Sequence, residues 1–331
     1  MSKIIILSTK ADSHLKFVTN HLSGEEILLI NPTDMFDGDA IDYVYKDRNV
    51  QVYYKDKLLN DVKSVWLRRP TQLSARRMPV KTSHIAHVKN AVGAHLEMFS
   101  FAFPEALWVS DSSAIKFADR KIVQLRLAAE IGFHVPETLF ASTPRRAKEF
   151  VDKHGICIAK TMAHILPLKT FAFTKVLRSG DDIDYTNLNL DPYIFQQYIE
   201  PSYELRVTVV GDQIFAAKVE GEETDGLTSQ YRDWRYAHAN DTFKATALQL
   251  SPELTKKCVR FVRELNLEFG ALDLIVDKKG HTWFLEINPN GQWAFVEMET
   301  GQPIGKAIAE KLKRGKQSQG SRKITTRPSG S

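Results

Sequence analysis

Cysteine is nearly absent from this sequence, whose 331 residues include Cys157 and Cys258 alone. Both stand in apolar stretches and match no metal-binding spacing, which removes cysteine-based metal sites from consideration. We expect two buried thiols in a reducing cytoplasm. Long hydrophobic runs are also missing, since no stretch approaches the ~20 apolar residues of a membrane span. The N-terminal MSKIIILSTK lacks the features of a signal peptide, so we predict a cytoplasmic protein with no membrane partner.

The body of the chain has no excess of either charge. The formal net charge is +5, but residues 313–331 hold six basic residues and no acid, which leaves −1 for the rest. The six are Lys313, Arg314, Lys316, Arg322, Lys323 and Arg327. The basic isoelectric point therefore reflects a tail, and we expect no nucleic-acid partner for the folded part. The tail is also rich in Gly, Ser and Gln, a composition typical of disorder.

Hydrophobic periodicity predicts a mixed α/β chain. Apolar runs at Lys3–Thr9 and Glu26–Ile30, with an amphipathic stretch between them, are typical of the opening of an α/β layer. Helical periods follow at His84–Phe103 and Asp119–Gly132, the second ended by glycine. With 43% hydrophobic and 26% charged residues, the chain is long enough for two or three packed lobes.

The stretch Ala271–Trp293 (ALDLIVDKKGHTWFLEINPNGQW) carries the most distinctive pattern. Two apolar runs flank the polar turn Asp277–Gly280, which predicts a β-hairpin. Acid or amide groups interrupt both runs where a core strand should be apolar, at Asp273, Glu286 and Asn288. Because side chains alternate faces along a strand, Glu286 and Asn288 point the same way.

The pairing register decides whether these oxygen-bearing side chains meet. If the connection is Lys278–His281, Asp273 lies directly across from Glu286, whereas a slip of one residue moves it to the other face. Three such side chains on a dry sheet repel one another unless a cation lies among them. Oxygen ligands without His or Cys suit Mg²⁺. The alternative, the solvent face of an antiparallel sheet, is disfavoured because Glu286 stands between Leu285 and Ile287.

An acid on one strand and E-x-N on its partner, followed by Pro and Gly, resembles the metal site of the ATP-grasp ligases. More narrowly, four segments resemble the microviridin-type ligases, or graspetide synthetases: EINPNGQW, FQQYIEPSYELRVTVVGDQIFAAKV, RDWR and SVWLRRP. The resemblance runs from about Lys3 to Leu312 and keeps the motifs in order. It implies an α/β (α+β) protein with an ATP-grasp fold, preceded by an N-terminal α/β domain, and ATP and Mg²⁺ as cofactors.

The resemblance also implies domain boundaries. We place the N-terminal pre-ATP-grasp domain at 1–115, the ATP-grasp domain at 116–312 and the basic tail at 313–331. Within the ATP-grasp domain, the small lobe spans about 135–200 and the large lobe about 201–312.

Nucleotide-binding roles follow from the same resemblance. Lys121, at the start of a predicted helix, and Lys160, at the end of a predicted strand, match the two lysines that reach the phosphates. The strand Tyr193–Ile199 resembles the one that receives adenine. The adenine contacts there are mostly main chain, around Gln196, Gln197, Tyr198 and Ile199. Glu204 matches the acid that accepts the ribose hydroxyls.

Two arginines match those that ATP-grasp ligases direct at phosphate groups: Arg206, on the strand of Glu204, and Arg235, in RDWR. We assign them the catalytic role. Lys218 is a third candidate for phosphate or substrate, although a solvated strand lysine is the stronger alternative. Many ATP-grasp proteins carry a glycine-rich loop over the phosphates, but TMAHILPLKT (161–170) has no glycine. That segment is expected to act as a lid rather than as a backbone cradle.

The resemblance implies that a carboxylate becomes an acyl-phosphate and is then joined to a hydroxyl or amine. The expected partner is a ribosomally made precursor peptide with a leader and an acidic core, whose Asp or Glu side chains are linked to Ser, Thr or Lys. Arginine pairs well with carboxylates, and the candidate peptide contacts are Arg68, Arg69, Arg232 and Trp234. The sequence leaves the oligomeric state open, a homodimer included.

Two other functions remain open. An ATP-grasp amino-acid ligase acting on a protein terminus or a small-molecule carboxylate would use the same chemistry. A nucleotide-binding regulatory protein would keep the fold without turnover. The full set of expected site residues argues against the regulatory protein: Lys160, Arg206, Arg235, Asp273, Glu286 and Asn288.

Overall fold

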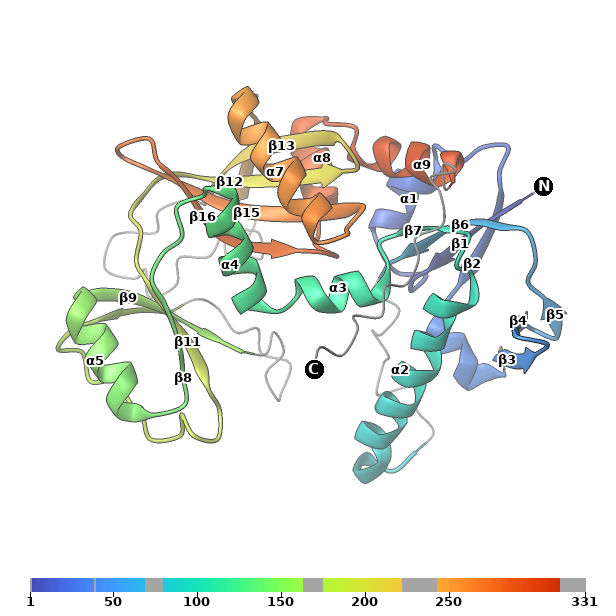
Figure 1. The fold of residues 1–331 in the computed structure, drawn as a ribbon, viewed down its shortest axis with the longest axis horizontal. Coiled ribbons are helices and arrows are strands. Elements are labelled where there is room, and N and C mark those ends of the chain that lie inside the picture. The colour runs from blue at the N-terminus through green and yellow to red at the C-terminus, as the bar shows by residue number, and fades with distance from the viewer. Residues whose placement is uncertain (1, 39, 69–79, 163–174, 222–242, 316–331) are drawn as a thin grey trace, which may run out of the picture. The chain divides into compact units, whose positions relative to one another are not determined.

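The computed structural model describes the chain except for residues 1, 39, 69–79, 163–174, 222–242 and 316–331 (Figure 1). The chain forms two compact units. One comprises Met1–Ser112 together with the residues from Gly305 onward, and the other comprises Ser113–Ile304. The first unit is therefore built from both ends of the sequence.

A parallel sheet in the order β2-β1-β6-β7 forms the centre of the first unit. Its strands are β1 (Lys3–Leu7), β2 (Glu26–Ile30), β6 (Val62–Leu67) and β7 (Leu107–Val109). β1 reads KIIIL, and Ile4, Ile5 and Ile6 are all fully buried. A continuous apolar run is what a parallel strand covered on both faces requires, and the predicted α/β opening is confirmed.

Helices and a small antiparallel sheet complete the described part of this unit. They are α1 (His14–Thr19), α2 (Ile85–Ala102), α9 (Ile304–Arg314), the short 3₁₀ helices η1 (Pro32–Asp37) and η3 (Thr82–His84), and the sheet of β3 (Ile41–Lys46), β4 (Asn49–Tyr54) and β5 (Lys57–Leu58). The C-terminal helix α9 is held in place by main-chain contacts. Ser64 Oγ donates to the carbonyl of Leu312 at 2.9 Å, and a Cβ at Gly305 would collide with the main chain of Phe17.

The second unit contains an antiparallel sheet in the order β10-β9-β11-β8. Its elements are β8 (Thr138–Ala141), α5 (Pro144–His154), β9 (Ile156–Thr161), β10 (Lys175–Arg178) and β11 (Tyr193–Gln197). Helix α5 covers one face, where Phe150 and Val151 pack with Cys157 and Phe195. Side chains alternate along each strand, so every second residue points to the other face, away from α5.

A five-stranded antiparallel sheet in the order β14-β13-β12-β15-β16 belongs to the same unit. Its strands are β12 (Pro201–Val210), β13 (Gln213–Gly221), β14 (Phe243–Ala247), β15 (Phe269–Asp277) and β16 (Thr282–Asn288). The helices are α3 (Ser112–Ala118), α4 (Lys121–Ile131), α7 (Pro252–Glu264) and α8 (Ala294–Thr300). The predicted hairpin at β15 and β16 is confirmed.

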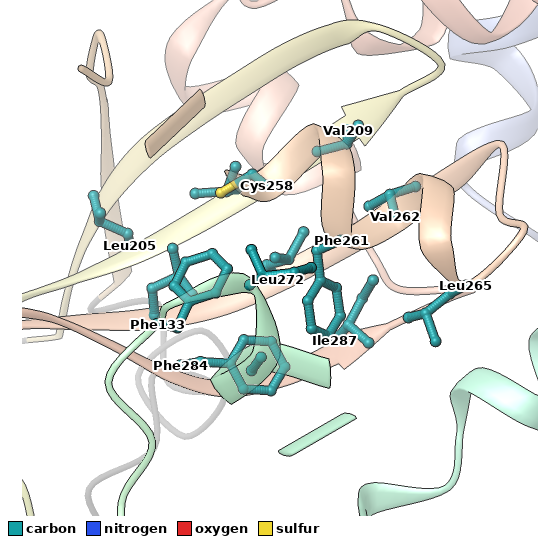
Figure 2. Close-up of a cluster of buried hydrophobic side chains, with 14 of the residues drawn as sticks. Phe133, Leu205, Val209, Cys258, Phe261, Val262, Leu265, Leu272, Phe284 and Ile287 are labelled. Atoms are coloured by element: carbon teal, nitrogen blue, oxygen red, sulfur yellow. The ribbon is translucent and has the colours of Figure 1, made fainter. Parts of the chain in front are cut away.

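The core of this sheet lies on the face covered by α4 and α7 (Figure 2). Phe261 of α7 contacts Phe133 and Phe284, with ring centroids 6.3 and 4.8 Å away. Leu272 of β15 and Ile287 of β16 pair across the strands and are fully buried in the same core. Because strand residues alternate, the residues beside Leu272 and Ile287 point to the opposite face.

Both cysteines are buried free thiols, as predicted. Burial raises the pKa of Cys157 to about 11 and that of Cys258 to about 12. Neither thiol is therefore a nucleophile near neutral pH. Among the described residues, no helix has the length and hydrophobicity of a membrane span.

Candidate active site

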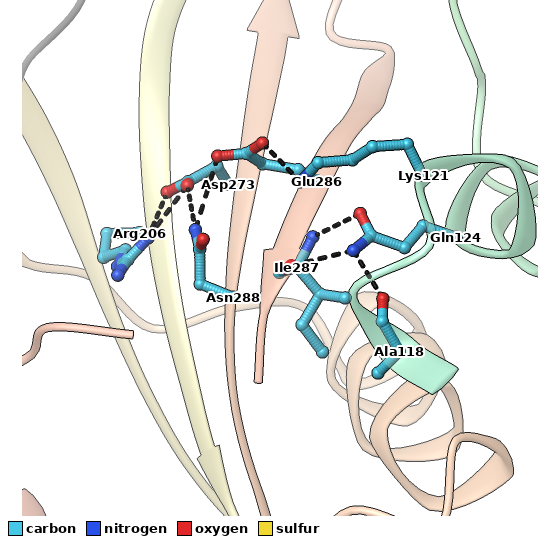
Figure 3. A network of polar contacts seen from close by, with 8 residues as sticks. All are labelled: Ala118, Lys121, Gln124, Arg206, Asp273, Glu286, Ile287 and Asn288. Carbon is cyan, nitrogen blue, oxygen red and sulfur yellow. Dashed lines mark hydrogen bonds and ion pairs between the residues drawn. The ribbon is translucent and has the colours of Figure 1, made fainter. Parts of the chain in front are cut away.

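Asp273, Glu286 and Asn288 meet on the face of the five-stranded sheet that lies opposite its core (Figure 3). Asp273 pairs directly with Glu286, which confirms the predicted register at this point. Asn288 Nδ2 donates to Asp273 Oδ2 at 3.1 Å and to Glu286 Oε1 at 3.4 Å. One amide thus contacts both carboxylates, so the three side chains converge.

This register depends on a β-bulge that the sequence analysis did not predict. Nearer the turn, Leu274 pairs with Phe284, one residue away from the predicted register. Leu285 is the extra residue of the bulge, after which Glu286 returns to its expected place. Because of the bulge, Phe284 and Ile287 both enter the core although they are three positions apart.

Arg206 of β12 lies across from Asp273 of β15 and is 2% exposed. Its Nη1 lies 2.7 and 2.8 Å from the two carboxylate oxygens of Asp273, and its Nη2 donates to the carbonyl of Gln292 at 2.8 Å. Gly291 makes room for this arrangement, since a Cβ there would lie 2.8 Å from Nη2. The guanidinium therefore binds a carboxylate of the predicted metal site, and its phosphate role stays a prediction.

The first turn of α4 contacts β16 through two side chains (Figure 3). Lys121 Nζ lies 2.8 Å from Glu286 Oε2. The fully buried Gln124 donates to the carbonyls of Ala118 at 2.6 Å and Ile287 at 3.0 Å, and accepts from the N–H of Ile287 at 3.1 Å. The predicted phosphate lysine thus lies directly at the carboxylate cluster.

The charges of this cluster balance, because two carboxylates face one lysine and one arginine. The donor set also fits Mg²⁺, since two carboxylates and an amide supply hard oxygen ligands. Rotating the Asn288 amide by half a turn directs its oxygen to the place that its nitrogen now takes. Nowhere in the described ranges do three or more His, Cys, Asp and Glu side chains gather as metal ligands. A site at Asp273 and Glu286 therefore needs Asn288 as its third ligand.

Two predicted nucleotide-binding residues share a face of the small sheet. Lys160 of β9 pairs with Ile194 and lies on the face away from α5, because its neighbour Ala159 packs in the α5 core. Gln196 of β11 lies on the same face, is 3% exposed, and donates from Nε2 to Thr138 Oγ1 at 3.0 Å. Their side chains thus share the side of the sheet that faces away from α5.

The predicted adenine stretch continues past the end of β11. The N–H groups of Gln197 and Tyr198 donate to the carbonyls of Glu137 and Ile156. Ile199 follows, half-buried. The main-chain N–H groups of the first two residues therefore bond within the protein, and the adenine-binding role of this stretch stays a prediction.

Two of the predicted nucleotide-binding residues, Glu204 and Lys218, lie on opposite faces of the five-stranded sheet. Glu204 shares the face of Arg206, two positions along the strand. Lys218 of β13 pairs instead with Leu205, whose side chain lies in the core. The Nζ of Lys218 lies 5.6 Å from the centroid of the Tyr203 ring. The register thus places Lys218 on the opposite side of the sheet from Arg206.

Arg68, a predicted peptide contact, is 1% exposed and belongs to a buried polar cluster in the first unit. Its Nε lies 3.2 Å from Asp12 Oδ2, and its Nη2 lies 3.2 Å from His14 Nδ1. Burial raises the pKa of Asp12, but the hydrogen bond with His14 and the charge of Arg68 outweigh it and hold that pKa well below its usual range. Arg68 is thus a buried counter-ion here, and peptide contact would require Asp12 to release it.

The remaining predicted site residues lie outside the described residues: Arg69, Arg232, Trp234 and Arg235. Most of the glycine-free segment 161–170 does so too, and the roles of all of them stay predictions. The sequence analysis gave no role to Gln124, and Gly291 entered it only as part of the EINPNGQW motif. A glutamine three residues after Lys121 shares its helix face, and a glycine directly follows N-P-N, so spacing could have indicated both.

Solved structures of two other proteins resemble this chain. A RiPP-associated ATP-grasp ligase from Chryseobacterium gregarium, in complex with ADP and a leader and core peptide, gives a TM-score of 0.82 at 24% identity, over 95% of this chain and 97% of that one. The macrocyclase MdnB from Microcystis aeruginosa gives a TM-score of 0.73 at 26% identity, over 94% and 99%. These similarities confirm the predicted ATP-grasp fold.

Sequence comparison extends this result. A "Probable alpha-L-glutamate ligase" from Desulfotalea psychrophila is 22% identical over 283 residues, which are 80% of this chain. The chain spans about half the length of that relative, 52%. The family model of the RimK-like ATP-grasp domain matches residues 118–312, more than half of the chain. The chain therefore belongs to the RimK-like ATP-grasp family.

Proposed function

We propose that this protein is an ATP-dependent, ADP-forming ligase that activates a carboxylate as an acyl-phosphate. The observation that carries the proposal is the convergence of Asp273, Glu286 and Asn288 beside Lys121 and Arg206. Three oxygen ligands next to two cations suit a polyphosphate with its divalent ion. Among the described residues the cluster contains no Ser, Cys or His, which favours direct attack by a substrate group over a covalent enzyme intermediate.

The side chains of the cluster have distinct roles in this proposal. Asp273, Glu286 and Asn288 would hold Mg²⁺, whose positive charge would neutralise the phosphate groups of the nucleotide. Lys121, a flexible cation at the start of α4 that pairs with Glu286, is proposed to contact a phosphate. Arg206 orients Asp273 from the neighbouring strand. Lys160 and Arg235 are proposed as further phosphate contacts.

The proposed reaction has two steps. A substrate carboxylate oxygen attacks the γ-phosphorus of ATP, and ADP leaves. A hydroxyl or amine of the substrate then attacks the acyl carbon, inorganic phosphate leaves, and the nucleophile loses its proton to solvent. The product is an ester or amide, and catalysis rests on positioning and on stabilisation of the charge that moves between oxygens.

We further propose that the substrate is a ribosomally made precursor peptide with a leader and an acidic core. Its Asp or Glu side chains would be linked to Ser, Thr or Lys of the same peptide. The Chryseobacterium ligase was solved with a leader and core peptide, and MdnB is a macrocyclase; this chain matches both over nearly its full length. The buried free thiols suit a reducing compartment, so we propose the cytoplasm as the location.

A second candidate is the addition of an amino acid to a protein terminus or a small carboxylate. The names of the curated relatives favour it, since the chain matches probable alpha-L-glutamate ligases from Desulfotalea psychrophila and Syntrophotalea carbinolica. The chemistry at the phosphate would be the same. Only the acceptor carboxylate and the attacking group differ.

One experiment separates the candidates. The purified protein, ATP and Mg²⁺ are incubated either with acidic peptides that also contain Ser, Thr and Lys or with free glutamate and carboxylate acceptors. Mass spectrometry then identifies the product, because each cross-link lowers the mass of the peptide by one water, whereas ligation raises the mass of the acceptor by one amino-acid residue. ADP release is followed in parallel. Failure to release ADP with any acceptor would contradict the ligase proposal, and glutamate addition without cross-linking would establish the second candidate.

A further inference from the structure

Strand β16 carries two of the three proposed metal ligands, although it stands at the edge of its sheet. In the order β14-β13-β12-β15-β16 it is the last strand, and on its other side the described residues supply a single bridge from His134 to Trp283 and no second strand. The N–H and C=O of Ile287 point to the open side, since both bond to Gln124 of α4 rather than to β15. The carboxamide of Gln124 therefore pairs with β16 as a further strand would (Figure 3).

The chemistry of Gln124 suits this place closely. Its Oε1 accepts from the N–H of Ile287, and its Nε2 donates to the carbonyls of Ile287 and Ala118. The side chain is fully buried, so these bonds replace those it would make with water. A glutamate at this position would have a carboxylate oxygen in place of Nε2 and could not donate to the two carbonyls. An asparagine is one methylene shorter, so its amide would not reach Ile287. Glutamine alone among these three residues makes all three bonds.

The main chain needs fixing at this point because Ile287 stands between Glu286 and Asn288. The bulge residue Leu285 directly precedes them, and a bulge interrupts the hydrogen bonds that set register. A shift by one residue would turn both ligands towards the core. Because side chains alternate, holding the N–H and C=O of Ile287 directs both of its neighbours to the face of Asp273.

We propose that Gln124 is a positioning residue for metal binding, which fixes the main chain of Ile287 and so directs Glu286 and Asn288 at one divalent ion. The inference rests on the proposed function in taking this cluster as the metal site. It is independent of the identity of the substrate. Residues outside the metal ligands that orient them typically account for about 10- to 100-fold in metal affinity.

The test compares two glutamine-to-methionine variants. Gln124→Met keeps the length of the side chain and removes its three hydrogen bonds. Gln302→Met is the matched control, because Gln302 Nε2 donates to the carbonyl of Ala216 on β13 at 3.2 Å, a bond of the same kind away from β16. Mn²⁺ binding at a fixed ADP concentration, followed by the electron paramagnetic resonance of free Mn²⁺ against the same ADP solution without protein, reports the site without turnover. We expect about 10- to 100-fold weaker Mn²⁺ binding for Q124M and none of this loss for Q302M.

Two further measurements keep the outcome unambiguous. Hydrogen exchange in the peptide covering Thr282–Asn288 should accelerate in Q124M and not in Q302M, and ADP affinity in EDTA should be unchanged in both. Faster exchange with wild-type Mn²⁺ affinity would overturn the proposal, because Gln124 would then be structural only. If Q124M loses as much affinity for ADP in EDTA as it loses for Mn²⁺, the proposal is overturned as well, because the effect is then not specific to the metal. If Q124M does not fold, Gln124→Asn, whose amide falls short of β16, serves in the same comparison. Wild-type protein that binds no Mn²⁺ with ADP would contradict the proposed function instead.

Discussion

Arg206 and Asp273 face each other across β12 and β15, and one guanidinium nitrogen lies 2.7 and 2.8 Å from the two carboxylate oxygens. Their side chains are 2% and 13% exposed. Removing one partner of a buried pair leaves the other charge uncompensated, which costs about 3–5 kcal/mol. The same carboxylate is a proposed metal ligand, so a divalent ion must share Asp273 with Arg206. This arginine therefore supports the ligand and also competes for it.

Removal of this arginine is the first test. Arg206→Met should lower the free energy of unfolding by about 3 kcal/mol, measured by urea denaturation. Adding Asp273→Asn should recover part of the loss, because the amide carries no charge to leave unpaired. Arg126→Met is the control, since Arg126 is 83% exposed and its surface ion pair with Glu130 should contribute less than about 1 kcal/mol. Strictly additive losses in the double variant would show that the two side chains are not coupled.

Replacement of the central carboxylate tests the metal site itself. Glu286→Gln should retain the fold but lower ATP turnover by more than about 100-fold, because an amide is a weaker ligand and Lys121 loses its counter-ion. ADP release is measured across a range of Mg²⁺ concentrations. Glu130→Gln, at an exposed position on α4, is expected to behave as wild type. Turnover that survives unchanged in Glu286→Gln would remove this residue from the site.

The sequence predicted correctly that Asp273 pairs with Glu286. The same predicted register is wrong by one residue nearer the turn, where Leu274 pairs with Phe284. Alternation of apolar and polar residues cannot show a bulge, because Leu285 is as apolar as its strand neighbours. The bulge is instead determined by tertiary packing, since Phe284 and Ile287 both fill the core between α4 and α7. The convergence of the polar residues was therefore predictable, and the path of the strand was not.

Other gaps in the prediction have similar causes. The short elements α3, α8 and β14 carry too few residues for a clear period, and β14 is ordered by pairing with β13. Gln124 reads as an ordinary polar residue of an amphipathic helix, because its partners are main-chain groups that no side-chain pattern reveals. Arg68 reads as a strand-end charge, whereas its burial depends on Asp12, a residue distant in sequence.

A methyl group at Gly291 should disturb the site without disturbing the core. A Cβ there would lie 2.8 Å from Arg206 Nη2, 2.9 Å from Asn288 Cβ and 3.1 Å from Ala271 Cβ. We expect Gly291→Ala to displace the guanidinium and to lower ATP turnover by about 10-fold or more, as loss of support around a metal ligand does. The control is Gly93→Ala on α2, where a Cβ meets nothing within 4 Å. Wild-type turnover in Gly291→Ala would mean that the loop relaxes at no cost to the site.

The buried cluster of Asp12, His14 and Arg68 predicts a specific dependence of stability on pH. In the folded state the hydrogen bond with His14 and the charge of Arg68 hold the pKa of Asp12 well below its usual range. A lowered carboxyl pKa stabilises the fold fully above the unfolded value, and this contribution is lost as the pH falls from there towards the lower folded pKa. The wild type should therefore unfold at a clearly higher temperature than Asp12→Asn at pH 6, by calorimetry. The gap should narrow as the pH falls below about 4.

An exposed aspartate provides the comparison for this last effect. Asp212 is 81% exposed and pairs with Arg263 at the surface. Asp212→Asn therefore removes one carboxylate charge, as Asp12→Asn does, but breaks no buried ion pair. Its unfolding temperature should follow that of the wild type closely at every pH, because solvent screens such a pair. Arg68→Met should instead reproduce the loss seen at pH 6, since it leaves Asp12 buried without its cation. If Asp12→Asn and the wild type differ by the same amount at pH 6 and at pH 3, the carboxylate contributes by its shape and hydrogen bonds, and its charge is not what holds Arg68 in the first unit.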